Sequence, residues 1–183
     1  MQGRYWTRQG PIGLWQLLGI RYHRSNDRVC IKSNGKQKEL MSPGDMLACC
    51  SLFKGCLSFG CGGGNPAFAW AWLYTHGIVT GGDYVEEGKM TKADGCWPYN
   101  FPKCAHHTNS SKYPACGKES YATPKCVSSC PNTNYSTPFE KDRHYTTSPI
   151  PDYFFFSKSI KKEIMANGPV SAAFTVYEDF HII

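Results

Sequence analysis

The feature that most constrains this chain is its cysteine content: ten cysteines among 183 residues, alongside 18 glycines and 12 prolines. That density favours a protein of an oxidising compartment over an ordinary cytosolic one, and the even count suggests five disulfides. Five of the cysteines lie between residues 81 and 156, a stretch rich in Gly, Pro, Ser and Asn with little periodicity. A core alone does not order a loop region of that length, so we expect disulfides to supply the constraint.

The remaining composition describes one ordinary globular domain or two small lobes. Apolar residues make up 41% and charged residues 19%, which excludes a disordered chain. No apolar run approaches the roughly 20 residues of a membrane helix, and residues 12–20 lack the cleavage site of a signal peptide. The net charge of +6 is spread along the chain without an aromatic–basic module. We expect neither a membrane nor a nucleic acid as partner.

Two helices are predicted from start and stop signals. Ser42 offers an N-cap, Pro43 a first helical residue and Asp45 an acid in the first turn, so a helix is expected to end near 49–50. A second helix is expected to begin with the Asn-Pro pair at 65–66 and to end at the His-Gly pair at 76–77.

A third helix and a strand are predicted further along the chain. Ser157 is the expected cap of a helix that carries Ile160, Ile164 and Met165 on one face, and the Asn-Gly-Pro triplet at 167–169 ends it. Apolar and polar residues then alternate from 170 to 177, which is a strand pattern.

A glycine-rich segment, G-C-G-G-G-N, spans residues 60–65 just before the second predicted helix. A phosphate-binding loop is one interpretation, but no Lys stands in the Walker position and the segment is not a G-x-G-x-x-G unit after a strand. The more economical interpretation is a backbone that a ligand or a second chain approaches closely.

Two adjacent histidines, His106 and His107, lie between Cys104 and Cys116. Exposed histidines need no role beyond solvation, but on a loop tethered by a disulfide they would offer positive charge and donors to a carboxylate. With the Cys-x3-Cys pair at 126–130 they supply the raw material of a zinc site, although that spacing is not the zinc-ribbon pattern. We expect disulfides there and no metal.

Two sequences match the acceptor pattern for N-linked glycans, Asn109-Ser110-Ser111 and Asn134-Tyr135-Ser136. Both matter only in a secreted chain.

Seven segments together resemble a cathepsin B-like member of the papain family of cysteine peptidases. They read DRVCI (27–31), SPGDMLACC (42–50), GCGGGNPAFAWAWLYTHGIVTGG (60–82), GCWPYNFPKCAHH (95–107), TPKCVSSC (123–130), KDRHY (141–145) and IMANGPVSAAFTVYEDF (164–180). The resemblance covers roughly residues 27–183 and implies an α+β, disulfide-rich, papain-like two-lobe fold that is only partly present. Residues 27–156 would form most of the left helical lobe, with an occluding loop at about 96–130. Residues 157–183 would form the truncated start of the right β-barrel lobe.

The resemblance also implies which cysteines pair. The pairs are Cys49–Cys126, Cys50–Cys56, Cys96–Cys130 and Cys104–Cys116, and the partners of Cys30 and Cys61 lie in family segments that this sequence does not contain. Four disulfides and two unpaired thiols therefore replace the first expectation of five disulfides.

Site residues follow from the resemblance in the same way. Gly63 and Gly64 match glycines whose backbone pairs with an extended substrate, and Pro66 and Ala173 match the lining of the main specificity pocket. His106 and His107 match histidines of the occluding loop, which hold a C-terminal carboxylate and so favour release of dipeptides from that end. The resemblance implies no cofactor.

The catalytic groups of the family have no counterpart in this chain. The reaction needs a thiolate, a His base and an orienting Asn. The family nucleophile belongs to a C-G-S-C-W-A-F motif before residue 27, where this chain has no Cys, and the family's His and Asn lie beyond residue 180. Permitted codons for residues 8–26, read from the second nucleotide with a G following, give V-R-D-Q-S-V-C-G-S-C-W-A-F-G-I-I-E-A-M. We therefore expect the aberrant segment 1–26 to be translated out of frame.

The expected function is that of a fragment of a cathepsin B-like cysteine-type peptidase that is inactive as written. The intact family member would act on peptides or proteins, release C-terminal dipeptides and meet cystatin-type inhibitors, in the lysosome or outside the cell. The alternatives are a non-catalytic peptide-binding module and a structural disulfide-rich protein. Because the strand at 170–177 would lack neighbours, we also expect low stability.

Overall fold

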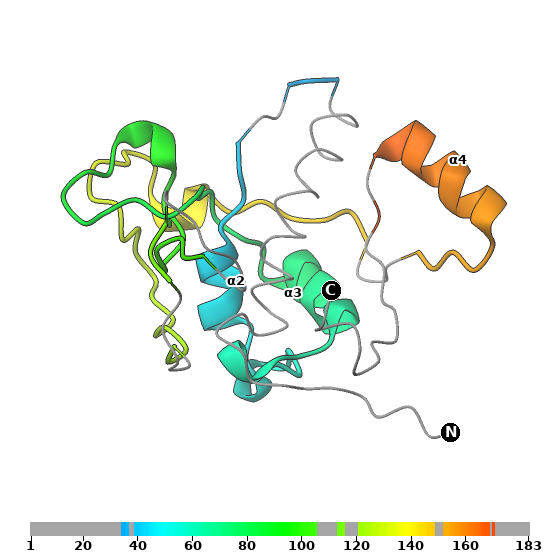
Figure 1. Cartoon of the computed structure of the whole chain (residues 1–183), viewed down its shortest axis with the longest axis horizontal. Helices are drawn as coiled ribbons and strands as arrows, with labels where there is room; N and C mark the ends of the chain where they lie inside the picture. Colours follow the sequence, from blue (N-terminus) through cyan, green and yellow to red (C-terminus); the bar gives the residue numbers. More distant parts are fainter. Residues whose placement is uncertain are drawn as a thin grey trace.

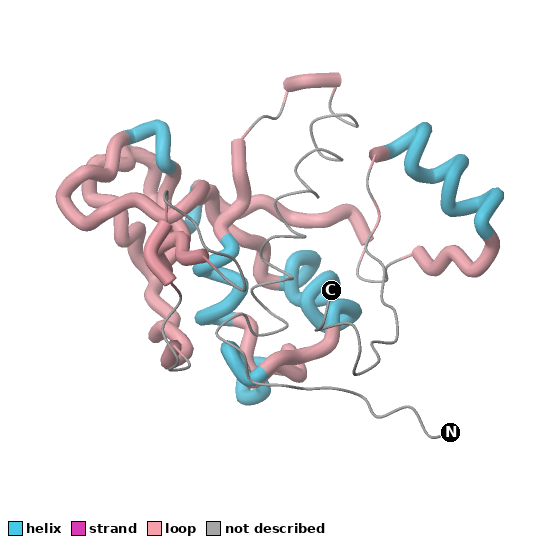
Figure 2. Tube along the Cα trace, in the orientation of Figure 1, coloured by secondary structure: helices cyan, strands magenta, loops and turns pink. Residues whose placement is uncertain are grey.

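The structure is a computed structural model that describes residues 34–36, 39–105, 113–115, 121–148, 152–168 and 170. Its elements follow the chain as α2 (Pro43–Cys49), η1 (Leu52–Lys54), η2 (Gly60–Gly62), α3 (Pro66–Thr75), η3 (Lys92–Asp94), η4 (Phe139–Lys141) and α4 (Ser157–Asn167), where η marks a short 3-10 helix. Figure 1 shows these helices joined by long loops. Within the described ranges the backbone forms four isolated β-bridges and no strand, so the β part of the expected α+β class is not seen there (Figure 2).

Helix α2 begins and ends where its sequence signals predict. The Ser42 side chain accepts a hydrogen bond of 3.0 Å from the Asp45 amide, and Pro43 occupies the first helical position. Every residue of α2 is buried, including Asp45. A helix of only seven residues is marginal by itself, so its stability comes from this packing.

Helix α3 also confirms its predicted ends. The Asn65 side chain caps it by accepting a hydrogen bond of 2.9 Å from the Ala67 amide, and His76 is the C-cap. Trp72 and Leu73 bring the helix into the core. The cap also fixes the junction between the helix and the glycine segment that precedes it.

Helix α4 has the predicted length, but its N-cap lies one residue before the predicted Ser157. Phe156 is the N-cap and Ser157 is already helical, and the Ser159 hydroxyl donates to the Phe156 carbonyl at 2.7 Å. No residue of α4 is buried, and Met165 is 87% exposed. The strand predicted at 170–177 lies outside the described residues, except for Val170.

Residues 78–81 form the centre of the core without belonging to a regular sheet. Their backbone groups hydrogen-bond to Leu40, Ser42, Trp97 and His144 at distances between 2.7 and 2.9 Å. Three segments far apart in sequence therefore satisfy the polar groups of one buried stretch. The side chains buried around it include Trp97, Leu73 and four of the cysteines.

Three disulfides hold this core together. They join Cys49 to Cys126, Cys50 to Cys56 and Cys96 to Cys130, and these are pairs that the resemblance implies. Cys104 is also disulfide-bonded, while its expected partner Cys116 lies outside the described residues, as does Cys30. Cys61 is a free thiol.

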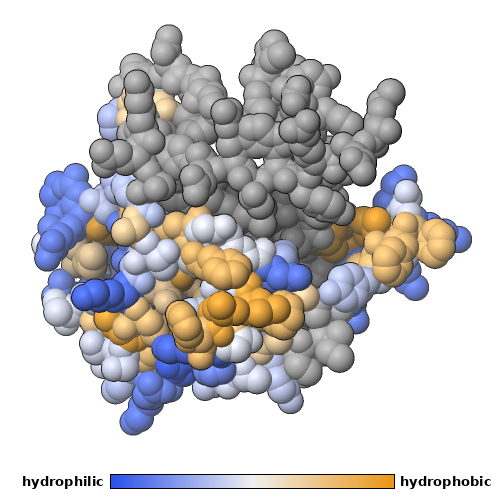
Figure 3. All heavy atoms as spheres, turned by 90° about the horizontal axis from the view of Figure 1, so that it is seen from below, coloured by the Kyte–Doolittle hydropathy of each residue, from blue (hydrophilic) through white to orange (hydrophobic). Residues whose placement is uncertain are grey.

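Most of the exposed large apolar side chains belong to two stretches of the described chain. The first holds Leu52, Phe53, Leu57, Phe59 and Phe68, and the second holds Tyr153, Phe155, Phe156, Ile164 and Met165. Figure 3 shows apolar surface on the face seen from below and on the part that projects at the right-hand edge, where α4 lies.

Candidate functional site

The glycine segment before α3 folds into a tight loop whose shape depends on glycine. Gly60 and Gly63 have φ values of 58° and 106°, which L side chains rarely adopt. A Cβ at Gly60 would also overlap the Thr123 side chain, whose hydroxyl accepts a hydrogen bond of 2.9 Å from the Cys61 amide. The loop is thereby attached to the segment that carries Cys126, which is bonded to α2.

The two glycines expected to face substrate differ in their hydrogen bonds. The Gly63 amide donates to the Gly60 carbonyl at 3.1 Å, and the Gly63 carbonyl accepts from the Phe59 amide at 2.9 Å. Gly64 forms an antiparallel bridge with Ser58. The Phe59–Gly63 hydrogen bond flanks this bridge, so Ser58 and Gly64 are a non-hydrogen-bonded pair, in which the N–H and C=O groups of each residue point away from the other.

This geometry makes Gly64 the outer edge of the loop, in the sense in which a sheet has an edge strand. Its amide and carbonyl point outward from the loop, and Gly64 itself is half-buried. Pro66, the first residue of α3, is also half-buried and lies directly after the Asn65 cap. Three of the expected site residues, Gly63, Gly64 and Pro66, are thus held within one short, anchored segment.

The other expected site residues, His106, His107 and Ala173, lie outside the described residues. The two ends of the loop that carries the histidines are nevertheless held together. Ala105 and Ala115 form a parallel bridge, and the Ala105 amide donates to the Pro114 carbonyl at 2.7 Å.

Further contacts brace the base of that loop. The ring centroids of Phe101 and Tyr121 lie 4.5 Å apart. This aromatic contact joins the two arms of the loop at its base. The Lys103 ammonium donates to the Asp83 carboxylate at 2.7 Å, and this hydrogen bond raises the pKa of Lys103. Both residues of the ion pair are exposed, so the contact positions Lys103 more than it stabilises the fold.

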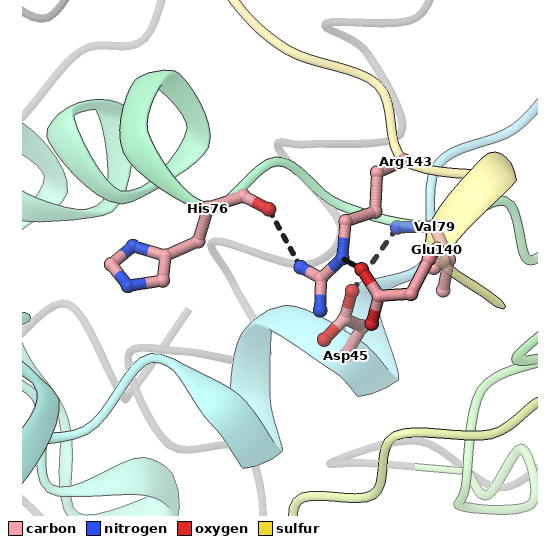
Figure 4. A network of polar contacts seen from close by, with 5 residues as sticks. All are labelled: Asp45, His76, Val79, Glu140 and Arg143. Atoms are coloured by element: carbon pink, nitrogen blue, oxygen red, sulfur yellow. Dashed lines mark hydrogen bonds and ion pairs between the residues drawn. The ribbon is translucent and has the colours of Figure 1, made fainter.

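A group of polar contacts, buried at Asp45 and exposed at Glu140, lies where α2, α3 and η4 meet (Figure 4). The Arg143 guanidinium donates to the His76 carbonyl at 2.6 Å and to the Glu140 carboxylate at 3.0 Å. Asp45, which is only 2% exposed, accepts from the Val79 amide at 3.1 Å. Burial raises the pKa of Asp45 to about 6, against the opposing effects of the Val79 hydrogen bond and of the Arg143 charge.

His76 belongs to the same network but is poorly placed for acid–base chemistry. Its ring stacks on Trp72 with 3.7 Å between centroids, and its Nδ1 lies 2.7 Å from the Thr75 hydroxyl. Burial lowers the pKa of His76, and the positive charges of Arg143 and Lys54 add to that effect. These contacts give the ring a structural role at the end of α3.

Sequence reasoning missed a second buried carboxylate, Asp142. Its Oδ2 accepts from the Thr80 amide and the Thr80 hydroxyl, each at 2.7 Å, and its Oδ1 accepts from the Tyr135 hydroxyl at 2.7 Å. Asp142 appears in the sequence only as part of KDRHY, where nothing local indicates a buried position.

No metal site is formed by the part of the chain that the structure describes, where no group of three or more His, Cys, Asp or Glu side chains is placed to hold an ion. The zinc alternative fails because Cys126 and Cys130 belong to two separate disulfides. Over the same described ranges, no helix has the length and apolar character that crossing a membrane requires.

Comparison of the sequence with known proteins identifies its relatives. The sequence model described as "Papain family cysteine protease" matches residues 22–182. Cathepsin B-like cysteine proteinase 5 of Caenorhabditis elegans is 43% identical over 159 residues, which cover 85% of this chain and 43% of that protein. A cathepsin B-like cysteine proteinase of Schistosoma japonicum is 46% identical over 154 residues, which cover 84% of this chain and 41% of that protein.

A solved structure agrees at the level of the fold. The structure of proCathepsin B S9 from Trypanosoma congolense superposes with a TM-score of 0.51 at 24% identity, covering 84% of this chain and 39% of that one. The chain therefore spans about two fifths of the length of the proteins it matches.

Proposed function

The chain belongs to the papain family of cysteine proteases, in its cathepsin B-like group, and we propose that it carries part of the substrate-binding surface of such a peptidase without the groups that cleave the peptide bond. The observation that carries the proposal is the outward-facing backbone of Gly64, next to the N-terminus of α3. An extended peptide that meets this edge can add to it as a strand does, by exchanging main-chain hydrogen bonds.

The conformation of the edge supports this role because it is set before any ligand arrives. Gly63 has both backbone groups engaged inside the loop, and Gly60 is packed against Thr123. A peptide that binds Gly64 therefore does not have to order the loop, which reduces the entropy lost on binding.

Selection of the substrate is assigned to residues on both sides of this edge. We assign Pro66 and Ala173 to the main specificity pocket. We assign His106 and His107 to the capture of a C-terminal carboxylate, which in the intact family member directs release of dipeptides from that end. The Ala105–Ala115 bridge supports the second assignment because it holds together the two ends of the segment in which these histidines occur.

Catalysis is the part of the function that we do not assign to this polypeptide. The reaction needs a thiolate activated by a His that an Asn orients. The motif that holds the nucleophile in the family is absent from these 183 residues, as are the segments that hold its His and Asn. For these 183 residues we therefore propose peptide binding alone, with peptide or protein substrates of the kind that the family takes.

Residues 1–26 have a separate explanation, namely translation in the wrong frame. We expect the coding DNA of residues 8–26, read from the second nucleotide, to encode V-R-D-Q-S-V-C-G-S-C-W-A-F-G-I-I-E-A-M. Sequencing the transcript decides the matter, because any other amino-acid sequence in that frame rejects the explanation.

The disulfides support a location in the lysosome or outside the cell, since such bonds persist in oxidising compartments. Besides peptide substrates, we propose cystatin-type inhibitors as partners, on the basis of the family alone.

Peptide binding is tested by fluorescence anisotropy with a labelled peptide that ends in a free carboxylate. Gly64→Pro removes the amide hydrogen, whereas Gly64→Ala keeps it and serves as the matched control. We expect Gly64→Pro to weaken binding by about fivefold to tenfold and Gly64→Ala to change it little. Equal affinities in the two variants would reject Gly64 as the binding edge.

Catalysis is tested with the same protein and a peptidyl epoxide that labels active-site thiolates. We expect no label and no turnover of a fluorogenic peptide. Covalent labelling of any cysteine in the unmodified chain, together with turnover, would show that the polypeptide is an enzyme.

A further inference from the structure

The sequence Asn134-Tyr135-Ser136 lies in a turn between Cys130 and η4, and its three side chains face different surroundings. Asn134 and Ser136 are exposed. Tyr135 is half-buried, and its hydroxyl donates to Asp142 at 2.7 Å. The middle residue is thus attached to the core, while the asparagine and the hydroxyl that define a glycan acceptor both reach solvent.

The turn itself is fixed by the buried side chain of Asn132. The Asn132 Nδ2 donates to the carbonyls of Thr91 and Gly95, each at 2.7 Å. Its Oδ1 accepts from the Asn134 amide at 3.1 Å. Asn134 therefore has a defined position beside residues 90–95, with the two segments running side by side in Figure 1.

The Asn134 amide group can carry a sugar without losing its contact to the protein. Its Nδ2 donates to the Met90 carbonyl at 2.7 Å, which uses one of its two hydrogens. A glycosylated amide keeps one hydrogen, so the bond to Met90 can persist after modification. The adjoining residues 86–89 and 91–93 are exposed and mostly polar or charged, which leaves space for a large hydrated group.

We propose that Asn134 is a site of N-linked glycosylation. The ligand is an oligosaccharide delivered on a lipid pyrophosphate by the transferase of the secretory pathway. The Asn134 Nδ2 forms a bond to C1 of the sugar, the bond from C1 to the pyrophosphate oxygen breaks, and Nδ2 loses one proton. The lipid pyrophosphate leaves, and nothing is oxidised or reduced.

The inference rests on the secretory location included in the proposed function, and the experiment separates the two. The full 183-residue chain is produced in eukaryotic cells behind a cleavable secretion leader, so entry into the pathway does not depend on its own location signals. The glycan is then removed with an amidase in heavy-oxygen water, which converts a glycosylated Asn into a labelled Asp that peptide mass spectrometry locates.

Two variants make the result specific. Ser136→Ala removes the acceptor pattern while leaving Asn134 and its contacts, and Ser136→Thr keeps the pattern. We expect the labelled Asp at 134 in the unmodified chain and in Ser136→Thr, and its complete loss in Ser136→Ala. The second acceptor sequence at 109–111 is mapped in the same spectra. Secreted protein that carries a glycan at 109 only, or no glycan, overturns the proposal.

Discussion

Asp45 accepts a hydrogen bond from the backbone amide of Val79, 34 residues away in sequence, with its carboxyl group buried inside the protein. This contact attaches the first turn of α2 to the central segment 78–81. It also places a titratable group where ionisation is costly, because burial disfavours the charged form.

The first prediction is that acid stabilises the fold through Asp45. Folding raises the pKa of this carboxyl group from 3.8 to about 6. The stability that its neutral form contributes is fully present below about pH 3.8 and is lost as the pH rises through about 6. The full difference is about 3 kcal/mol, from ~1.4 kcal/mol per pKa unit.

The measurement is urea denaturation at several pH values between about 4 and about 7. Asp45→Asn keeps an acceptor for the Val79 amide but does not titrate, so over this pH range its stability should depend less on pH by about 2 kcal/mol. Asp83→Asn, at an exposed ion pair with Lys103, is the control and should keep the pH dependence. Parallel curves for the unmodified chain and Asp45→Asn would contradict the prediction.

The second prediction concerns Asp142, which accepts three hydrogen bonds from Thr80 and Tyr135. Asp142→Ala leaves the buried Thr80 donors without their acceptor, and we expect it to lower the free energy of unfolding by about 2–3 kcal/mol. Tyr135→Phe removes one hydrogen bond and should cost about 1 kcal/mol. Thermal or urea unfolding provides both values, and equal losses in the two variants would disprove the assigned role.

The third prediction compares two disulfides that close loops of different length. The Cys96–Cys130 bond spans 34 residues and Cys50–Cys56 spans 6. On the chain-entropy model their losses cost about 4 and about 2 kcal/mol. Paired Cys→Ser variants should therefore show greater destabilisation for the longer loop, and the reverse order would indicate that packing of the sulfurs dominates.

The fourth prediction is that alkylation of the unreduced chain in denaturant labels Cys61 and Cys30 and no other cysteine. Cys61 is a free thiol in the structure, and the resemblance places the partner of Cys30 in a family segment that these 183 residues do not contain. Peptide mass spectrometry before and after reduction identifies the labelled positions. Joint protection of Cys30 and Cys61 would mean that the two cysteines bond to each other.

Local signals were enough to predict the helices but not the core that they join. The ends of α2 and α3 follow from Ser42, Asn65 and their prolines, because a cap satisfies backbone groups only a few residues away. The cap of α4 differs from the prediction because Phe156 caps it through the backbone, without a side-chain hydrogen bond. Sequence near α4 could not distinguish position 156 from 157.

The burial of polar side chains could not be predicted from the neighbouring sequence, for a different reason. Asp45 has the appearance of an ordinary first-turn acid, and Asp142 that of a loop residue, because the donors that each meets are distant in sequence. The distinction between Gly63 and Gly64 likewise depends on how Phe59 pairs with the loop. The resemblance indicated the segment, and only the backbone geometry separated the two residues.

The overlap that a side chain at Gly60 would make with Thr123 couples the choices of residue at two distant positions. Any larger residue at 60 would require both a left-handed backbone and a smaller neighbour at 123, so single substitutions at 60 are penalised twice. A single substitution at residue 60 is therefore poorly tolerated as long as residue 123 keeps its size. Replacement of Gly60 in an evolving sequence therefore requires a simultaneous or earlier change at Thr123.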